Sequence, residues 1–168
     1  AAIRIGIYNA QMQWLLIMDA DGQYEINDLK TFWERKSSYD FIIGYRRKRE
    51  DNLYRKILSK LGNLIANLFL KTNTFIKDID CGFKLFRKKV FEKIPKLQAE
   101  RGPFITSEYL IKAKKAGFKI AEVGIHHYPR KAGAATGRSM KVILSGLSDL
   151  IKLRFKIYSG GISGDEKD

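Results

Sequence analysis

Hydrophobic residues in this chain fall into short runs separated by stretches with helical spacing. Two continuous apolar runs, WLLIM at 14–18 and DFIIGY at 40–45, are bounded by polar or turn residues. Such runs are typical of central strands covered on both faces of a sheet. In KIAEVGIHHY at 119–128, apolar residues alternate with polar or small ones, which predicts a strand with one covered face.

Apolar residues at intervals of three and four predict the helices. Residues 52–70 combine an apolar face with a polar stripe made of Arg55, Ser59, Asn63 and Asn67. Residues 81–91 are expected to form a strand that enters a helical turn, and 107–116 a helix that Gly117 ends. Residues 139–158 predict an amphipathic helix with a basic face, before a flexible tail at 159–168. Alternating strands and helices favour the α/β class, with a mixed central sheet flanked by helices.

Size and composition narrow the protein class. A chain of 168 residues, 45% of them hydrophobic, can bury one sizeable core. A single cysteine excludes a disulfide within the chain and fits a reducing compartment. No signal peptide pattern is present, and no apolar stretch reaches the roughly 18 residues of a spanning helix. We therefore expect a protein at the cytoplasmic face of a membrane, bound peripherally.

The net charge of +14 favours polyanionic partners, which include nucleic acid, anionic lipid and nucleotide phosphates. The basic residues are spread along the chain instead of forming one tail. Charge by itself therefore does not choose among these partners.

The most informative polar residues follow the first apolar run directly. Asp19 and Asp21 lie two positions apart where the predicted strand ends, and ligands of α/β sheets gather at that end. Both carboxylates can point the same way and hold Mg²⁺ or Mn²⁺, with Gln23 as a further oxygen ligand. An ordinary turn after a strand would use the same residue types, so the motif has two interpretations.

The order of motifs separates these interpretations. DADGQ is followed by GYRRKR, YRKILSKLGN, DIDCGFKLFRKKVF, TSEYLIKAKKAGFKIAEV and PRKAGAATGRS. This ordered set resembles the family 2 glycosyltransferases, in particular the dolichol-phosphate mannose synthases and other polyprenyl-phosphate sugar transferases. The resemblance implies a GT-A fold and an inverting transfer of sugar from a UDP- or GDP-linked donor with a divalent cation. It also implies a lipid-phosphate acceptor, contact with a membrane, and no nucleic acid partner.

The resemblance assigns roles residue by residue. Asp19, Asp21 and Gln23 match the metal and diphosphate site. Residues that match substrate-binding positions are Arg46, Arg55, Ser59 and Arg138, and those that match catalytic positions are Asp78, Glu108 and Arg130. Which of Arg130 and Arg138 corresponds to the family's arginine stays open, because RKAGAATGRS holds extra residues between the first arginine and the serine.

The chemistry of the acceptor decides whether a base is needed. A lipid phosphate is already anionic, so Arg55 and Ser59 would position it without a base. A hydroxyl acceptor would need a general base, for which Asp78, Asp80 and Glu108 are the candidates.

Several of these residues also have ordinary structural interpretations. The polar stripe at 55–67 has the pattern that is more often found on the solvated face of an amphipathic helix. Cys81 is typical of a small buried side chain. His126 and His127 point to opposite faces of a strand, which favours structural hydrogen bonds over a shared metal. The helix at 139–158 could pack on its own sheet or lie on a membrane surface.

The resemblance also has a gap at its start. Family members place a strand and a nucleotide-base pocket well before the Asp-x-Asp motif. Here the first strand run already begins at residue 14, and residues 1–11 are expected to be a helix. Residues 1–158 are therefore expected to be the carboxyl-terminal part of a catalytic domain, with an exposed sheet edge. The rival hypothesis is a basic module without catalysis that binds nucleic acid or anionic membrane.

Overall fold

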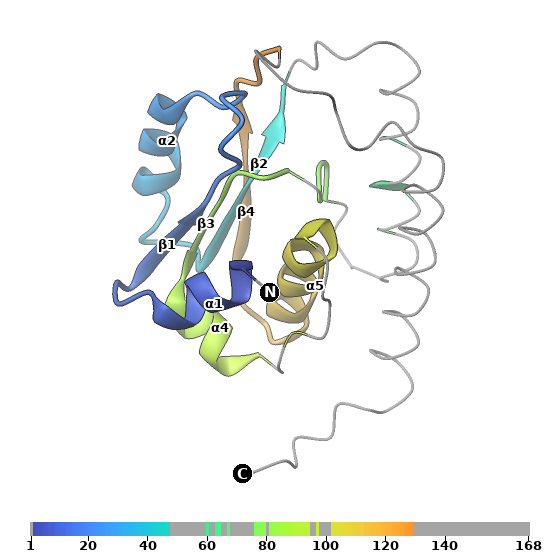
Figure 1. The fold of residues 1–168 in the computed structure, drawn as a ribbon. Helices are drawn as coiled ribbons and strands as arrows, with labels where there is room; N and C mark the ends of the chain where they lie inside the picture. Colours follow the sequence, from blue (N-terminus) through green and yellow to red (C-terminus); the bar gives the residue numbers. More distant parts are fainter. Residues whose placement is uncertain are drawn as a thin grey trace.

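The described part of the chain contains a four-stranded sheet with helices on both faces (Figure 1). The computed structural model describes residues 2–47, 60, 63, 64, 67, 76–79, 81–94, 97 and 102–129. Its elements, in chain order, are α1 (Ala2–Asn9), β1 (Trp14–Ile17), the 3-10 helix η1 (Ile26–Asp28), α2 (Leu29–Glu34), β2 (Phe41–Arg46), β3 (Lys84–Arg87), α4 (Lys88–Lys93), α5 (Gly102–Lys115) and β4 (Ile120–Ile125). Lys60, Asn63, Leu64 and Asn67 are helical, as predicted for 52–70. The predicted helix at 139–158 and the tail at 159–168 lie outside the described residues.

The strand directions bring several loops to one edge of the sheet. The strand order is β1-β3-β2-β4. Strand β3 is antiparallel to both β1 and β2, whereas β2 and β4 are parallel. Consequently the carboxyl ends of β1, β2 and β4 and the start of β3 lie at the same end of the sheet, which we call its carboxyl edge. This mixed sheet confirms the predicted α/β class.

Aromatic side chains fill the core on both faces of the sheet. On one face, Phe32 of α2 packs against Phe83, with ring centroids 4.9 Å apart. On the other, Tyr109 of α5 packs against Phe41 and Phe86 at 5.1 and 4.7 Å. All five side chains are buried, so they contribute large apolar areas to stability. The sheet is thus held between α2 and α5 (Figure 1).

The two continuous apolar runs take different places in the sheet. Strand β2 is central, and Phe41, Ile42 and Ile43 are completely buried, as predicted. The prediction was wrong for β1, which pairs with β3 alone among the described strands and leaves Leu16 36% and Met18 40% exposed. A run of apolar residues looks the same in an edge strand and a central strand, because pairing partners come from distant sequence.

Helix α5 is longer than its periodicity predicts. The predicted helix began at Ser107, but α5 begins at Gly102 and has 14 residues. Pro103 lies in the first turn, where its missing N–H costs no hydrogen bond, so proline there marks a start and not a break. The predicted stop is confirmed, since the helix ends at Lys115 and Gly117, two residues later, has φ +79°. Within the described ranges, no helix combines the length and hydrophobicity needed to cross a membrane.

Candidate active site

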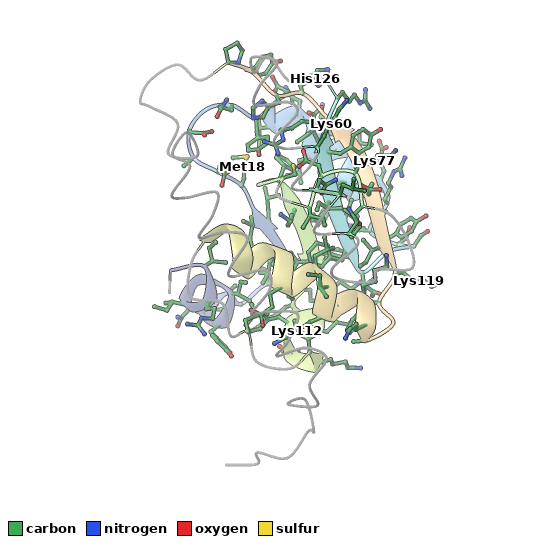
Figure 2. The ribbon with its side chains drawn as sticks, turned by 90° about the vertical axis from the view of Figure 1, so that its right-hand side faces the viewer. Met18, Lys60, Lys77, Lys112, Lys119 and His126 are labelled. Atoms are coloured by element: carbon green, nitrogen blue, oxygen red, sulfur yellow. The ribbon has the colours of Figure 1, made fainter. Side chains whose placement is uncertain are left out.

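The loop after β1 places the Asp-x-Asp motif at the shared carboxyl edge of the strands. Asp19 is exposed and Asp21 is partly buried. Gly22 has φ +72°, and the Asp21 carboxylate accepts a hydrogen bond from the Gln23 N–H at 3.2 Å. This local turn was one of the two interpretations of the motif, and it leaves both carboxylates beside the sheet edge. Figure 2 marks the region through Met18, Lys77 and His126, which lie at that end of the molecule.

The Asp19 carboxylate lies directly against Gly82, the residue two positions before β3. A Cβ on residue 82 would overlap the Asp19 carboxylate, so the absence of a side chain makes room for it. The Gly82 N–H also donates a hydrogen bond to the Tyr24 hydroxyl at 3.0 Å. Gly82 therefore brings the start of β3 into contact with the motif loop.

The motif loop is also fastened to the segment that follows β4. The side-chain amide of Gln23 donates to the carbonyl oxygen of Tyr128 at 2.9 Å, and the Tyr128 N–H donates to the carbonyl oxygen of Gln23 at 2.8 Å. Their neighbours in the sequence, Tyr24 and His127, form an antiparallel β-bridge. Gln23 thus holds the loop in place through its amide, an anchoring contact that its sequence position alone did not reveal.

Arg46 and Asp78 form a bidentate ion pair at the end of β2. The Arg46 Nε lies 2.7 Å from one Asp78 oxygen, and its NH2 donates to the other at 2.8 Å. Both side chains are 12% exposed. Burial alone would lower the pKa of Arg46, but the hydrogen bonds and charge of Asp78 outweigh it and raise that pKa above its usual value. Two residues that the sequence singled out separately are therefore one unit.

Tyr24 lies between this ion pair and the motif loop. Its ring contacts Phe83 and His127, with centroids 5.7 and 5.4 Å away. Burial raises the pKa of its hydroxyl, and the charges of Arg46 and Asp19 also act on it. The phenol therefore stays protonated, and it accepts a hydrogen bond from the Gly82 N–H. Sequence analysis missed Tyr24, although an aromatic residue next to the motif was a signal.

The segment that carries Asp78 is held by Asn63 and Asn67, two helical residues of the predicted polar stripe. Asn63 and Asn67 bond to the backbone of residues 76–79, and Asn67 is only 6% exposed. The interpretation of this stripe as a solvated face is therefore wrong for these two asparagines. A solvated stripe and a stripe that binds a loop have the same spacing, so only the tertiary contacts distinguish them.

Glu108 lies inside the protein, away from solvent. Its carboxylate is completely buried on α5 and pairs with the Lys112 ammonium one turn later, at 2.6 Å. A buried pair of this kind stays intact because separating it would leave an unpaired charge in the core. The remaining predicted site residues lie outside the described residues: the substrate-binding Arg55, Ser59 and Arg138, the catalytic Arg130, and the base candidate Asp80.

His126, His127 and Cys81 take structural positions in the described structure. His126 donates its backbone N–H to Asp28 at 2.6 Å, and its Nδ1 lies 2.9 Å from the same carboxylate. His127 packs on Tyr24. Cys81 is completely buried, and burial raises the pKa of its thiol. The contacts of these three residues agree with the structural interpretation given to each.

The donor set at Asp19 and Asp21 fits a hard divalent cation. Within the described residues, no cluster of three or more His, Cys, Asp or Glu side chains is arranged to hold a metal ion. Mg²⁺ in phosphate-transfer sites is commonly held by one or two carboxylates, with substrate phosphates and water as its other ligands. The chemistry of the two motif carboxylates is therefore compatible with an ion that would arrive with a diphosphate.

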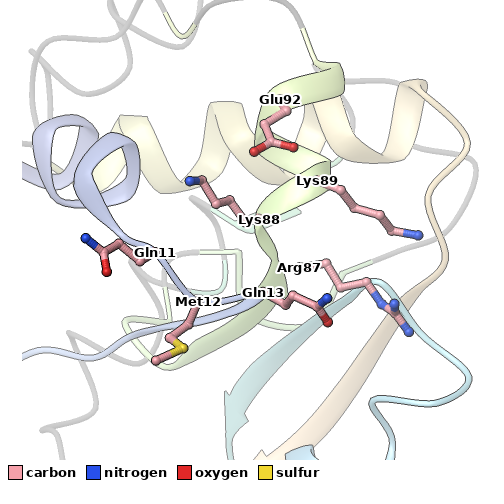
Figure 3. Close-up of a pocket in the computed structure, with 7 residues that line it drawn as sticks. All are labelled: Gln11, Met12, Gln13, Arg87, Lys88, Lys89 and Glu92. Atoms are coloured by element: carbon pink, nitrogen blue, oxygen red, sulfur yellow. The ribbon is translucent and has the colours of Figure 1, made fainter.

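A basic pocket lies at the opposite edge of the sheet, where β1 begins and β3 ends. It has a volume of about 360 Å³, and its lining is shown in Figure 3: Gln11, Met12, Gln13, Arg87, Lys88, Lys89 and Glu92. Arg87 and Lys89 are paired with Asp40, at 3.6 and 3.1 Å. The pocket is therefore separate from the Asp-x-Asp edge.

Substituting Gly82 is expected to disrupt the motif. In Gly82→Ala, the new methyl group would push the Asp19 carboxylate aside, and because that side chain is exposed and can rotate away, we expect the free energy of unfolding to fall by only about 1 kcal/mol or less. Cation-dependent nucleotide binding should fall by about tenfold or more, because the carboxylate is displaced by more than a metal–ligand bond tolerates. Thermal unfolding and calorimetry measure the two effects.

Gly6→Ala is the matched control, because a Cβ at Gly6 in α1 meets nothing within 4 Å. It should leave binding unchanged and stability equal or slightly higher. Undiminished binding in Gly82→Ala would show that Asp19 does not need its place against Gly82.

Comparisons with known proteins place the chain in a family. The sequence profile of the family "Glycosyl transferase family 2" matches residues 1–95. A dolichyl-phosphate beta-glucosyltransferase from Dictyostelium discoideum is 28% identical over 95% of this chain and 51% of its own length. Glycosyltransferase AglD from Haloferax volcanii is 30% identical over 69% of this chain and 19% of its own. The chain thus spans about half or less of the length of these relatives.

Solved structures share the fold at low sequence identity. Glucosyl-3-phosphoglycerate synthase from Mycobacterium tuberculosis, in complex with phosphoglyceric acid, superposes with a TM-score of 0.69 at 10% identity, over 92% of this chain and 53% of the other. The same enzyme in complex with Mn²⁺, UDP-glucose and glycerol 3-phosphate gives a TM-score of 0.62 at 8% identity, with the same coverage. The similarity confirms the predicted GT-A fold.

Proposed function

Because the chain belongs to glycosyl transferase family 2, we propose that it forms part of an enzyme that moves a sugar from a nucleoside diphosphate to a lipid phosphate. The transfer is proposed to invert the anomeric centre with help from a divalent cation. The observation that carries the proposal is the placement of Asp19 and Asp21 at one sheet edge with the Arg46–Asp78 pair.

Asp19 and Asp21 are proposed to hold the cation, which is Mg²⁺ or Mn²⁺, with Gln23 fixing the loop that carries them. When bound, such an ion offsets the charge that develops on the departing diphosphate. A structural relative with the same fold binds Mn²⁺ together with UDP-glucose, which supports this assignment.

Arg46 is proposed to act on the same diphosphate. Its guanidinium stays charged at every working pH, since its pKa is raised, and Asp78 fixes its direction with two hydrogen bonds. A fixed, charged donor stabilises developing negative charge without reorganising during the reaction. In this proposal Asp78 orients Arg46 and does not serve as a base.

The pairing of the carboxylates favours a phosphate acceptor over a hydroxyl. A hydroxyl acceptor needs a general base, and the two base candidates that the structure describes are both engaged: Asp78 is bound to Arg46, and Glu108 is buried against Lys112. A lipid phosphate attacks through an oxygen that is already anionic. Relatives named as dolichyl-phosphate beta-glucosyltransferases support the same class of acceptor.

The other residues carried over by resemblance keep their proposed roles. Arg55 and Ser59 are proposed to bind the acceptor phosphate, and Arg130 and Arg138 to act at the donor phosphates. UDP-glucose is the proposed sugar donor, because relatives are named glucosyltransferases and a structural relative binds UDP-glucose. A lipid acceptor also implies contact with a membrane surface, proposed here as peripheral and on the cytoplasmic face.

The function is tested by incubating the chain with UDP-glucose, Mn²⁺ and dolichyl phosphate in detergent micelles. We expect glucosyl dolichyl phosphate to form, no product with dolichol, and no product when a chelator removes the cation. A parallel reaction with GDP-mannose in place of UDP-glucose tests the other candidate donor.

Binding of UDP to the chain, measured by calorimetry with and without Mn²⁺, separates donor binding from transfer. Transfer to dolichol as fast as to dolichyl phosphate would contradict the proposed acceptor. A folded chain that neither transfers sugar nor binds UDP with Mn²⁺ would contradict the proposal as a whole.

A further inference from the structure

Residues 76–79 place Asp78 beside Arg46 at the end of β2 and form neither a helix nor a strand. Ile76, Asp78 and Ile79 are buried although none belongs to a helix or strand. Their backbone groups need hydrogen-bond partners, because unpaired N–H and C=O groups are costly away from water. Those partners come largely from two asparagines distant in the sequence.

Asn63 bonds to the backbone on both sides of Asp78. Its side-chain amide donates to the carbonyl oxygens of Ile76 and Lys77, at 2.8 and 2.5 Å. Its side-chain oxygen accepts the N–H of Ile79 at 3.1 Å. One side chain therefore fixes the peptide groups before and after the aspartate.

Asn67 lies one helical turn further on and holds the start of the same segment. Its side chain accepts the N–H of Ile76 at 2.9 Å and donates to the carbonyl oxygen of Ile76 at 2.9 Å. The same amide donates to the carbonyl oxygen of Asn63 at 2.8 Å, which joins the two asparagines. Glu122 of β4 supports the segment from the other side by accepting the Lys77 N–H at 2.8 Å.

We propose that Asn63 and Asn67 are positioning residues for the transfer reaction, which they influence through Asp78 and Arg46. This inference rests on the proposed function. The clamp formed by the two asparagines sets the position of the Asp78 backbone, and the Asp78 carboxylate sets the direction of the Arg46 guanidinium. A displaced loop would leave Arg46 charged but misdirected, and misplacement by about 1 Å is enough to slow a reaction strongly.

The clamp also connects two proposed binding groups. Ser59 and Arg55, the proposed acceptor-phosphate residues, precede Asn63 by four and eight positions on the same polar stripe of the sequence. The helix that fixes the Arg46–Asp78 pair is thus the element on which the acceptor residues are predicted.

The first test measures the clamp without any reaction. Hydrogen exchange of the Arg46 Nε–H and the Ile79 amide is followed by NMR in the native chain, Asn63→Ala and Leu64→Ala. Leu64 is the matched control, since it is the next residue on the helix and is 45% exposed. We expect exchange at both groups to speed up by about tenfold in Asn63→Ala and by less than twofold in Leu64→Ala, as expected for the loss of one partly buried hydrogen-bonding group.

The amide of Ile42 in the central strand reports global opening and should exchange at its native rate. If Ile79 loses protection while the Arg46 Nε–H does not, the inference is overturned. If Asn63→Ala does not fold, Asn63→Ser is measured against Leu64→Ser with the same expectations and the same contradicting result.

The second test asks whether the asparagine acts through Arg46. We expect Asn63→Ala to lower kcat about tenfold with little change in KM for the donor, and to have no further effect when Arg46→Ala is already present. Independent losses that multiply in the double variant would overturn the inference. A native chain without transferase activity would contradict the proposed function, whereas the exchange measurement would still decide whether the clamp positions Arg46.

Discussion

An Asp21→Asn chain is expected to lose Mn²⁺-dependent binding of UDP by about 100-fold or more, because cation-mediated contacts with a diphosphate contribute several kcal/mol. The amide keeps the shape of the carboxylate and its oxygen can still accept the Gln23 N–H. The fold of the loop is therefore retained while the charge that attracts the cation is removed. Calorimetry with and without Mn²⁺ measures the change.

Glu25→Gln is the matched control for this prediction. Glu25 is a carboxylate in the same segment, where it accepts hydrogen bonds from Asn27 and lies outside the Asp-x-Asp motif. Its replacement should leave Mn²⁺-dependent binding within twofold of the native value. Equal losses in Asp21→Asn and Glu25→Gln would indicate that general negative charge, and not a defined cation site, governs binding.

Replacing Arg46 is expected to reduce both stability and activity. In Arg46→Ala, the Asp78 carboxylate would stay largely buried without its partner, which should cost about 3 kcal/mol of unfolding free energy. We also expect kcat/KM for transfer to fall by about 100-fold or more, since the fixed cation beside the diphosphate is lost. Urea unfolding and steady-state kinetics measure the two quantities.

A second substitution separates the two effects. Arg46→Ala combined with Asp78→Asn removes the uncompensated charge, so much of the lost stability should return. Activity should not return, because the guanidinium is still absent. Recovery of activity together with stability would show that Arg46 has only a structural role.

Arg47→Ala provides a comparison at the neighbouring position. Arg47 is an exposed arginine at the same end of β2, and its side chain lies over Gly124. Loss of this positive charge should change kcat/KM by less than about threefold, as expected for an exposed, screened charge. A loss as large as that of Arg46→Ala would point to the overall positive potential as the active feature.

Much of the fold could be predicted because its signals are local. The alternation at 120–125, the apolar run of β2 and the Gly117 stop all appear where their periodicity placed them. Local patterns were insufficient for β1 and for the start of α5. The number of partners a strand has, and the tolerance of proline in a first helical turn, depend on context that a short window does not contain.

The candidate site was predictable in part, for a similar reason. Asp19 and Asp21 could be identified because a motif and a strand end coincide in the sequence. Arg46 and Asp78 were named from separate motifs, and their pairing followed only from the folded sheet. Tyr24, Gly82 and the two asparagines were missed as site components, since each acts through contacts with distant segments.

The sequence by itself determined the α/β class and the family and led to the residues proposed to hold a cation, because periodicity, motif order and side-chain chemistry are properties of the chain. The tertiary structure alone decided which carboxylates are already paired: Asp78 with Arg46, and Glu108 with Lys112. It also decided that Asn63 and Asn67 bind a loop instead of facing water. Pairing and burial depend on distances between segments far apart in the chain, and folding sets those distances by packing the whole sheet and its helices together.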